Sequence, residues 1–216
     1  MPTYIAWKTP LLMKIDRVAK FKQRSQLTQN PYLKGLPGVA GGACVGATFA
    51  WLNRHLQSPA ESPRNRAAFL SLDDTWCRIS VYCSAFNSTL ILDHINRINA
   101  NLPNICGRQD SSSTVEYGEQ GLSGLVTHIN ATQPGYYVWE FTFESTEKMS
   151  THVCGLYADK NGMSFFDPNS GEYRIRPDKK LEFLQKLYKH YLNYVSGTGA
   201  KKALKMDELY LVQLGG

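Results

Sequence analysis

The sequence lacks the features that would place the chain in a membrane, in a disulfide-rich scaffold or around a structural metal. It has no apolar run of about eighteen residues and no charged, apolar and small leader at its start, so we expect neither a membrane span nor a Sec signal peptide. Its 5 cysteines form no CxxC pair, which argues against a structural zinc site or a redox dithiol. Their odd number also argues against a full disulfide framework.

Repeats and low-complexity tracts are absent as well, and the composition is too apolar for a disordered chain. The 216 residues, 43% of them hydrophobic and 12% aromatic, suffice for one globular domain with a sizeable core. We therefore predict a single domain over 1–216. In this prediction 1–37 form a basic N-terminal segment and loop, and 38–216 form the functional core.

Nucleic-acid-binding motifs are also missing, so we expect no nucleic-acid partner although the net charge is +6. The positive charge gathers near the two ends of the chain, where acidic residues are sparse. These residues are Lys14, Arg17, Lys20, Lys22 and Arg24, and then Lys179, Lys180, Lys186, Lys189, Lys201, Lys202 and Lys205. Solvated faces of two helices explain them most simply, and contact with an anionic membrane surface or an acidic partner is the alternative.

The first half of the chain is predicted to be mostly helical. A basic amphipathic segment over 11–25 is followed by a loop rich in Pro and Gly up to residue 42. Apolar residues then recur at helical spacing, which predicts a buried helix that begins at Cys44 and ends at Ser58-Pro59. Asp73 or Asp74 is the expected N-cap of one long helix that carries apolar residues as far as Ile98.

The second half changes from helical periodicity to alternation. Polar residues over 104–119 predict a surface loop near a substrate cleft or a plain linker, and a short helix follows at about 122–129. Alternating apolar and polar residues over 137–144 predict a half-buried strand. The other expected elements are strands at 151–158, 163–166 and 172–176, a helix from Pro177 to about Val195 and a last strand at 209–214. Short turns between successive strands imply an antiparallel meander, so the predicted fold class is α+β.

Cys44 lies where a glycine-rich turn enters the first buried helix. The free backbone N–H groups at a helix start, together with the helix dipole, favour a thiolate there. The same amides are suited to bind the oxyanion of a tetrahedral intermediate. A small cysteine near glycines is more often a core residue, so this position does not establish catalysis by itself.

A histidine and an aspartate are expected to meet in one strand hairpin. His152 lies between apolar and small residues on its strand, and a buried histidine needs polar partners. Asp167 ends the next strand, where the turn at 160–162 brings the chain back beside His152, although Asp-Pro-Asn-x-Gly is also good turn chemistry without catalysis. Together with Cys44 at a helix start, the pair matches the nucleophile, base and orienter of covalent thiol catalysis.

At this point the sequence resembles a known family. The strings GGACVGATFAWL around Cys44 and THVCGLYADKNGMSFFDPNSGEYRI around His152 and Asp167 resemble the YopT/AvrPphB-type cysteine peptidases of bacterial virulence effectors. In that family, a G-x-C-x-x-x-S/T-x-x-W helix carries the nucleophile, and an H-x-x-G…F-F-D-P-N-x-G hairpin carries the other two residues.

The resemblance implies a papain-like fold in which Cys44 is the nucleophile, His152 the general base and acid, and Asp167 the orienter. It implies no metal and no organic cofactor. It also implies a protein that a bacterium secretes without a Sec signal peptide and that cleaves a selected protein in the cytosol of a target cell. A cognate chaperone or an immunity protein is a further candidate partner.

One departure from the papain-like pattern concerns the oxyanion. Papain-like enzymes commonly place an Asn or Gln about five or six residues before the nucleophile, but Val39 and Gly38 occupy those positions here. Gln29 or Asn30 reaching back over the loop, or backbone amides alone, are the alternatives.

Other residues and other reactions remain open from the sequence. His128 is a rival base without a following aspartate in a hairpin, and Cys154 shares a strand face with His152 as either a redox neighbour or a core residue. The same three residues would also suit deamidation, transglutamination or cleavage of peptidoglycan amides. A binding module with a relic site is the third hypothesis, and we favour cleavage of a target-cell protein.

Overall fold

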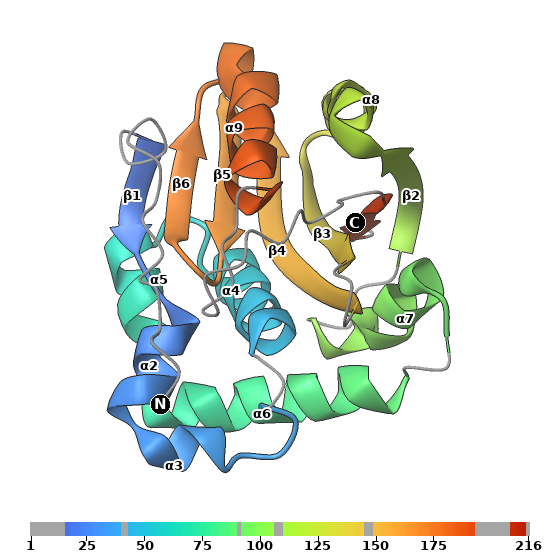
Figure 1. Cartoon of the computed structure of the whole chain (residues 1–216). Coiled ribbons are helices and arrows are strands. Elements are labelled where there is room, and N and C mark those ends of the chain that lie inside the picture. The colour runs from blue at the N-terminus through green and yellow to red at the C-terminus, as the bar shows by residue number, and fades with distance from the viewer. Residues whose placement is uncertain are drawn as a thin grey trace.

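The structure is a computed structural model that describes residues 16–39, 43–89, 92–105, 110–144, 149–192 and 208–214. The strands are β1 (Arg17–Lys20), β2 (Asp110–Tyr117), β3 (Gly135–Glu144), β4 (Met149–Asp159), β5 (Gly162–Asp167), β6 (Gly171–Ile175) and β7 (Glu208–Leu214). They form one antiparallel sheet in the order β1-β6-β5-β4-β3-β7-β2 (Figure 1). Within these ranges, no helix is long and apolar enough to cross a membrane.

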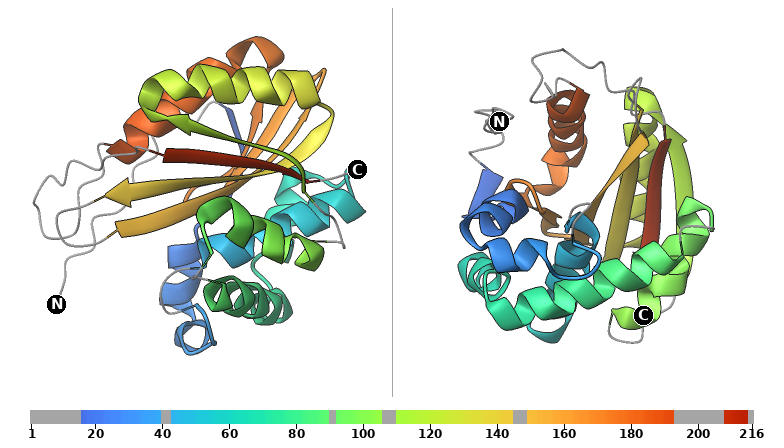
Figure 2. Two further views of the ribbon diagram at one scale, coloured as in Figure 1. Left: turned by 90° about the vertical axis from the view of Figure 1, so that its right-hand side faces the viewer. Right: turned by 60° about the horizontal axis from the view of Figure 1, so that its bottom comes forward.

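Helices cover both faces of the sheet. The first group is α2 (Gln23–Gln29), α3 (Pro31–Lys34), α4 (Cys44–Gln57), α5 (Pro63–Phe69), α6 (Asp73–Ser88) and α7 (His94–Asn101), with the short 3-10 turn η1 (Leu102–Asn104). The second group is α8 (Gly118–Thr132) and α9 (Lys180–Leu192), the latter preceded by the 3-10 turn η2 (Pro177–Lys179). Figure 2 shows α8 and α9 on one face of the sheet and α4, α6 and α7 on the other. The α+β fold class is therefore confirmed.

The core between the sheet and the α8–α9 layer follows the predicted alternation. Tyr137, Trp139 and Phe141 of β3 all point into this core and are almost fully buried. Apolar side chains of α8 and α9, such as Leu125 and Leu187, complete it. The alternating apolar residues of β3 and the periodic apolar residues of α8 and α9 thus pack against each other in one core layer.

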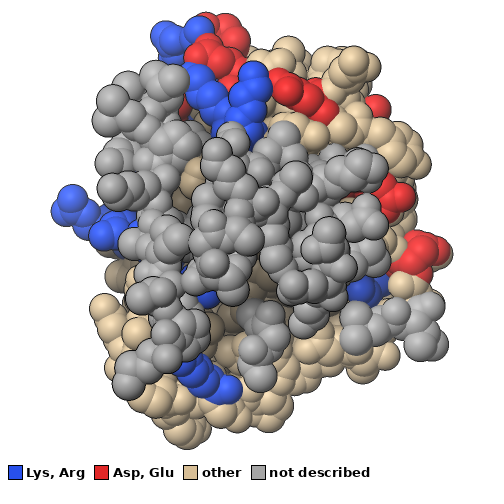
Figure 3. Space-filling model, in the orientation of Figure 1, with Lys and Arg blue, Asp and Glu red and all other residues tan. Residues whose placement is uncertain are grey.

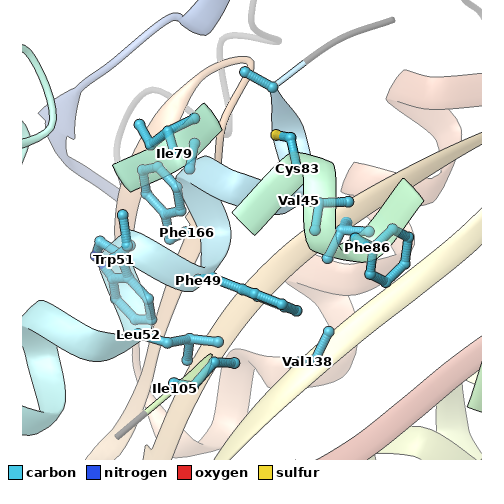
Figure 4. Close-up of a cluster of buried hydrophobic side chains, with 14 of the residues drawn as sticks. Val45, Phe49, Trp51, Leu52, Ile79, Cys83, Phe86, Ile105, Val138 and Phe166 are labelled. Carbon is cyan, nitrogen blue, oxygen red and sulfur yellow. The ribbon is translucent and has the colours of Figure 1, made fainter. Parts of the chain in front are cut away.

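The core on the opposite face is built around α4. Phe49 of α4 meets Phe86 of α6 edge to face, with ring centroids 6.3 Å apart, and Val138 of β3 closes the layer from the sheet side (Figure 4). Because α4 lies between α6 and the sheet, it is apolar on nearly all sides. The predicted buried helix, with its start at Cys44 and its end at Ser58, is confirmed.

The basic segment expected over 11–25 is interrupted by a strand in the part that the structure describes. Residues 17–20 form β1, which pairs with β6 at the sheet edge, and α2 begins only at Gln23. Ala19 is buried while Val18 and Lys20 are exposed, so the segment alternates as an edge strand does. Residues 11–15 lie outside the described ranges.

The single long helix expected between Asp73 and Ile98 is two helices. Leu72, not an aspartate, is the N-cap of α6, and Asp73 and Asp74 lie in its first turn, where their charge suits the helix dipole. The chain restarts as α7 at Asp93, whose carboxylate accepts from the N–H of Asn96 at 2.9 Å. This strong N-cap makes a new helix start more favourable than continuation.

The surface loop or linker expected over 104–119 is also wrong where the structure describes it. Residues 110–117 form β2, which pairs with β7 along its length, and 106–109 lie outside the described ranges.

The strand β3, which the sequence predicts to be half-buried, is covered on both of its faces. On the second face Glu140 is fully buried and accepts from Arg97 of α7.

Positive charge near the C-terminus is paired on the outer face of α9. Lys179 and Lys186 contact Glu182, and Lys189 contacts Glu119 of α8. Figure 3 shows basic and acidic side chains intermixed at the top of the molecule. A solvated helix face accounts for these lysines. Lys180 differs because it is buried, and it donates to Asn130 and Gln133. Lys14, Val195, Lys201, Lys202 and Lys205 lie outside the described residues.

Candidate active site

The start of α4 brings Cys44 to the sheet. Cys44 is the first residue of the helix, Ala43 is its N-cap, and the thiol is half-buried. One turn further on, the Thr48 hydroxyl donates to the carbonyl of Val153 at 2.9 Å. This hydrogen bond joins α4 to β4 at the residue next to His152, so it sets the distance between the cysteine and the histidine strand.

A tryptophan one turn beyond Thr48 makes the second connection. The Trp51 indole packs against Gly155, where an added Cβ would lie 2.9 Å from the ring. The indole also stacks on Phe166 of β5 with centroids 5.5 Å apart, and its Nε1 donates to Glu172 of β6 at 2.8 Å. The Trp of the helix motif therefore packs directly against the Gly of the hairpin motif.

His152 and Asp167 meet on the face of the sheet that α9 covers. The β4–β5 register pairs Gly155 with Phe166, and it places the His152 Nε2 atom 2.9 Å from Oδ1 of Asp167. Both side chains are buried. The thiol of Cys44 is a hydrogen-bonding neighbour of the imidazole. The structure therefore brings together the three residues that the sequence singled out.

Asp167 is held as a carboxylate by a full set of donors. Its oxygens accept from His152, from the backbone N–H of Asn169 at 2.9 Å and from the hydroxyl of Ser170. Burial by itself would raise the pKa of Asp167, but these hydrogen bonds and the charge of His152 hold that pKa below its usual value. The Asp167 side chain therefore does two things: it accepts the hydrogen bonds that close the Asp-Pro-Asn-Ser turn, and it orients the imidazole of His152.

The imidazole of His152 is biased toward its charged form. Burial lowers its pKa, but contacts with Cys154, Asp167 and Cys44 outweigh burial and raise the pKa well above its ordinary value. Because Asp167 is an acceptor only, the Nε2 of His152 carries the proton that faces it. Nδ1 is then the nitrogen left to exchange a proton with a thiol.

Tyr191 of α9 is a member of this network that sequence reasoning missed. Its hydroxyl lies 2.9 Å from Nε2 of His152 and donates to Oδ1 of Asp167 at 2.9 Å. Burial raises the pKa of Tyr191 well above its ordinary value, so the hydroxyl stays neutral and remains a donor. In the sequence, Tyr191 was one more apolar position of a helix, and nothing local distinguished it from its neighbours.

Cys154 lies beside His152, as strand alternation predicted, and it belongs to the core. Its thiol is fully buried, and burial raises its pKa to about 12. The donor atoms of His152, Cys154 and Asp167 lie within 4.8 Å of one another, and among the described residues they are the one such group able to hold a metal. A thiol must lose its proton to bind a metal, and this pKa makes that loss costly.

The rival residues are used elsewhere. His128 of α8 contacts Ser112 at 3.3 Å through Nε2, on the β2 side of the sheet. Asn30 caps α3 and donates to Asp73, and Gln29 is an exposed residue at the end of α2. The side chain that does reach the start of α4 is Gln23, whose Oε1 accepts from the N–H of Ala43 at 2.9 Å.

Comparisons with known proteins agree with this geometry. The family model Peptidase_C58, described as Yersinia/Haemophilus virulence surface antigen, matches residues 98–207, about half of the chain. That range includes His152 and Asp167, whereas Cys44 lies outside it. A comparison with curated proteins gives no match.

Two solved structures are similar to the chain. The Pseudomonas avirulence protein AvrPphB has a TM-score of 0.66 and 16% identity, with 94% of this chain and 100% of that chain covered. PatoxP, a cysteine protease-like domain of the Photorhabdus asymbiotica toxin PaTox, has a TM-score of 0.40 and 15% identity, with 91% of this chain and 52% of that chain covered. The similarity to AvrPphB confirms the papain-like fold. By the family match and this fold, the chain belongs to the Peptidase_C58 family of virulence proteins and is a cysteine peptidase.

Proposed function

We propose that Cys44, His152 and Asp167 are the nucleophile, the general base and acid, and the orienting carboxylate of this peptidase. The observation that carries the proposal is the buried His152–Asp167 hydrogen bond, together with the Cys44 thiol as a hydrogen-bonding neighbour of the same imidazole. A raised histidine pKa and an ionised aspartate are what a thiolate–imidazolium pair requires.

The reaction follows from the positions of these atoms. His152 takes the thiol proton at Nδ1, and Sγ of Cys44 attacks the substrate carbonyl while the carbonyl electron pair moves to oxygen. The C–N bond then breaks, the leaving amine takes the proton from His152, and a thioester remains on Cys44. Water hydrolyses the thioester with His152 as base. Asp167 keeps Nε2 protonated throughout and stabilises the charged ring.

The substrate in this proposal is a protein of a target cell, and the enzyme acts in the cytosol of that cell after secretion without a Sec signal. The family of virulence proteins supports a protein substrate in a host. Contact with an anionic membrane surface and a cognate chaperone or immunity protein belong to the same proposal. No nucleic acid takes part in it.

Cys44→Ala tests the proposal directly. The variant should fold like the wild type and lose all cleavage of target-cell proteins, because the other thiol beside His152 among the described residues, that of Cys154, is fully buried in the core. Cys77→Ala is the matched control, since Cys77 is an exposed cysteine on α6 and should be dispensable. Intact-mass analysis of a treated lysate reads the result, because cleavage breaks a chain whereas deamidation does not. Cleavage that persists in Cys44→Ala would overturn the assignment.

A further inference from the structure

The usual oxyanion side chain has no room in this fold. Gly38 has a φ of +76°, and an added Cβ would lie 2.6 Å from the backbone N of Ser84. Val39 is a buried core residue with an apolar side chain. The two positions that commonly carry an Asn or Gln therefore offer no side-chain donor, and the backbone around Gly38 excludes one.

Gln23 brings a carboxamide to the residue before the nucleophile. It lies between β1 and the body of α2, far from Cys44 in sequence, and its side chain is buried. Its Oε1 accepts from the N–H of Ala43, the residue before the nucleophile. Its Nε2 donates to Oδ1 of Asn169 at 2.8 Å, two residues after Asp167. The carboxamide thus spans the start of α4 and the turn that follows the histidine hairpin.

The hydrogen bonds of the Gln23 carboxamide use only one of its two N–H donors. A carboxamide nitrogen carries two hydrogens, and in Gln23 one of them goes to Asn169. The second has no acceptor among the described residues. The backbone of Gln23 is also fixed, because its N–H donates to the carbonyl of Pro168 at 2.8 Å. The free N–H belongs to a group whose plane is held from both ends, which is the preorganisation that oxyanion stabilisation requires.

Resting on the proposed function above, we propose that Gln23 is a catalytic residue that donates its second Nε2–H to the oxyanion. The oxyanion forms when Sγ of Cys44 bonds to the substrate carbonyl carbon and the carbonyl electron pair moves to oxygen. The thiol proton goes to His152. The backbone N–H of Cys44, one of the groups at the helix start without an intrahelical acceptor, is the second donor. A neutral amide supplies this stabilisation without adding charge to the site.

Two small reagents separate the oxyanion role from a structural one. Acylation of Cys44 by p-nitrophenyl acetate passes through a tetrahedral oxyanion and releases p-nitrophenolate. Alkylation by iodoacetamide forms a C–S bond and releases iodide without any oxyanion. Both rates are followed at Cys44 by peptide mass, so other thiols do not interfere. The variants are Gln23→Met and Gln23→Glu, and Gln26→Met is the control, since Gln26 lies on the same helix and contacts Ser71 instead.

We expect acylation in Gln23→Met to slow on the order of 100-fold while alkylation stays near the wild-type rate. Gln23→Glu keeps an acceptor for Ala43, places a negative charge near the oxyanion and should lose at least as much. Gln26→Met should change neither rate. Equal loss of both rates in the Gln23 variants would show a structural role and overturn the proposal, as would no loss at all. A wild-type Cys44 that reacts with neither reagent would instead refute the nucleophile assignment and both proposals with it.

Discussion

The hydroxyl of Tyr191 is the polar atom of α9 that enters the buried site. It donates to Asp167 in a place that water does not reach, and hydrogen bonds to charged groups are worth about 1.5–3 kcal/mol. Tyr191→Phe should therefore lower the free energy of unfolding by about that amount at neutral pH. Urea denaturation of the two proteins measures the difference.

The pH dependence of this loss distinguishes the carboxylate from simple packing. The pKa of Asp167 is lowered in the folded protein, so its stabilisation is present above the unfolded pKa and is lost as pH falls through the folded one. The stability gap between wild type and Tyr191→Phe should thus be full at neutral pH and shrink in acid. Tyr137→Phe is the control, because the buried Tyr137 hydroxyl contacts two neutral groups, the Thr132 hydroxyl at 3.0 Å and the Ile129 carbonyl at 3.4 Å, so its loss should not depend on the charge of Asp167. An equal gap at all pH values would contradict the explanation.

At the scale of elements, α4 carries a buried histidine, His55, whose burial makes stability depend on pH. His55 lies near the end of the helix, packs on Tyr157 and contacts the Tyr136 hydroxyl at 3.0 Å through Nδ1. Burial, aided by the charge of Arg66, lowers its pKa from 6.5 to about 4. The folded protein thus keeps this ring neutral at pH values where an unfolded chain would protonate it.

His55→Gln tests this effect. Between pH 6.5 and about 4 the unfolded wild type binds a proton that the folded state does not, so stability falls as the pH is lowered. The loss due to His55 should reach at most about 3 kcal/mol. Glutamine cannot titrate, so the variant should lack this part of the slope, while His152 and Asp167 contribute equally in both proteins. Chemical denaturation at several pH values reads the difference, and identical slopes would refute it.

Elements with a regular apolar pattern were predictable from the sequence, whereas elements that depend on a distant partner were not. The helix at Cys44 and the strands from 135 to 175 have apolar periods that local reading detects. The strand β2 has the sequence DSSSTVEY, and its polar residues suggest a loop. It becomes a strand only because β7, far along the chain, pairs with it. The pattern of apolar and polar residues within 110–117 does not indicate that such a partner exists.

The site shows the same division. The residues Cys44, His152 and Asp167 stand in two local motifs, each of which is visible in a short stretch of sequence. Gln23 and Tyr191 reach the site from α2 and α9, and only the folded chain places them there. A tyrosine on an apolar helix face and a glutamine after a basic strand are ordinary residues until their neighbours are known.

At the scale of the whole molecule, the N-terminal strand links the edge of the sheet to the active site. The strand β1 pairs with β6, and the chain then runs directly into Gln23, which contacts Ala43 and Asn169. The position that permits this pairing is Gly171. It has a φ of +124°, and an added Cβ would lie 2.1 Å from the carbonyl oxygen of Ala19.

Gly171→Ala should therefore separate β1 from the sheet and weaken the site from a distance. The strained backbone alone costs about 1–3 kcal/mol, and the collision with Ala19 adds to this loss of unfolding free energy. Hydrogen exchange should accelerate over 17–20, and acylation of Cys44 should slow because Gln23 loses its support. Gly35→Ala is the matched control, since Gly35 has a φ of −76° and an added Cβ there would come no closer than 3.4 Å to the Tyr32 carbonyl. A Gly171→Ala protein with wild-type exchange over 17–20 would show that this contact does not hold the strand.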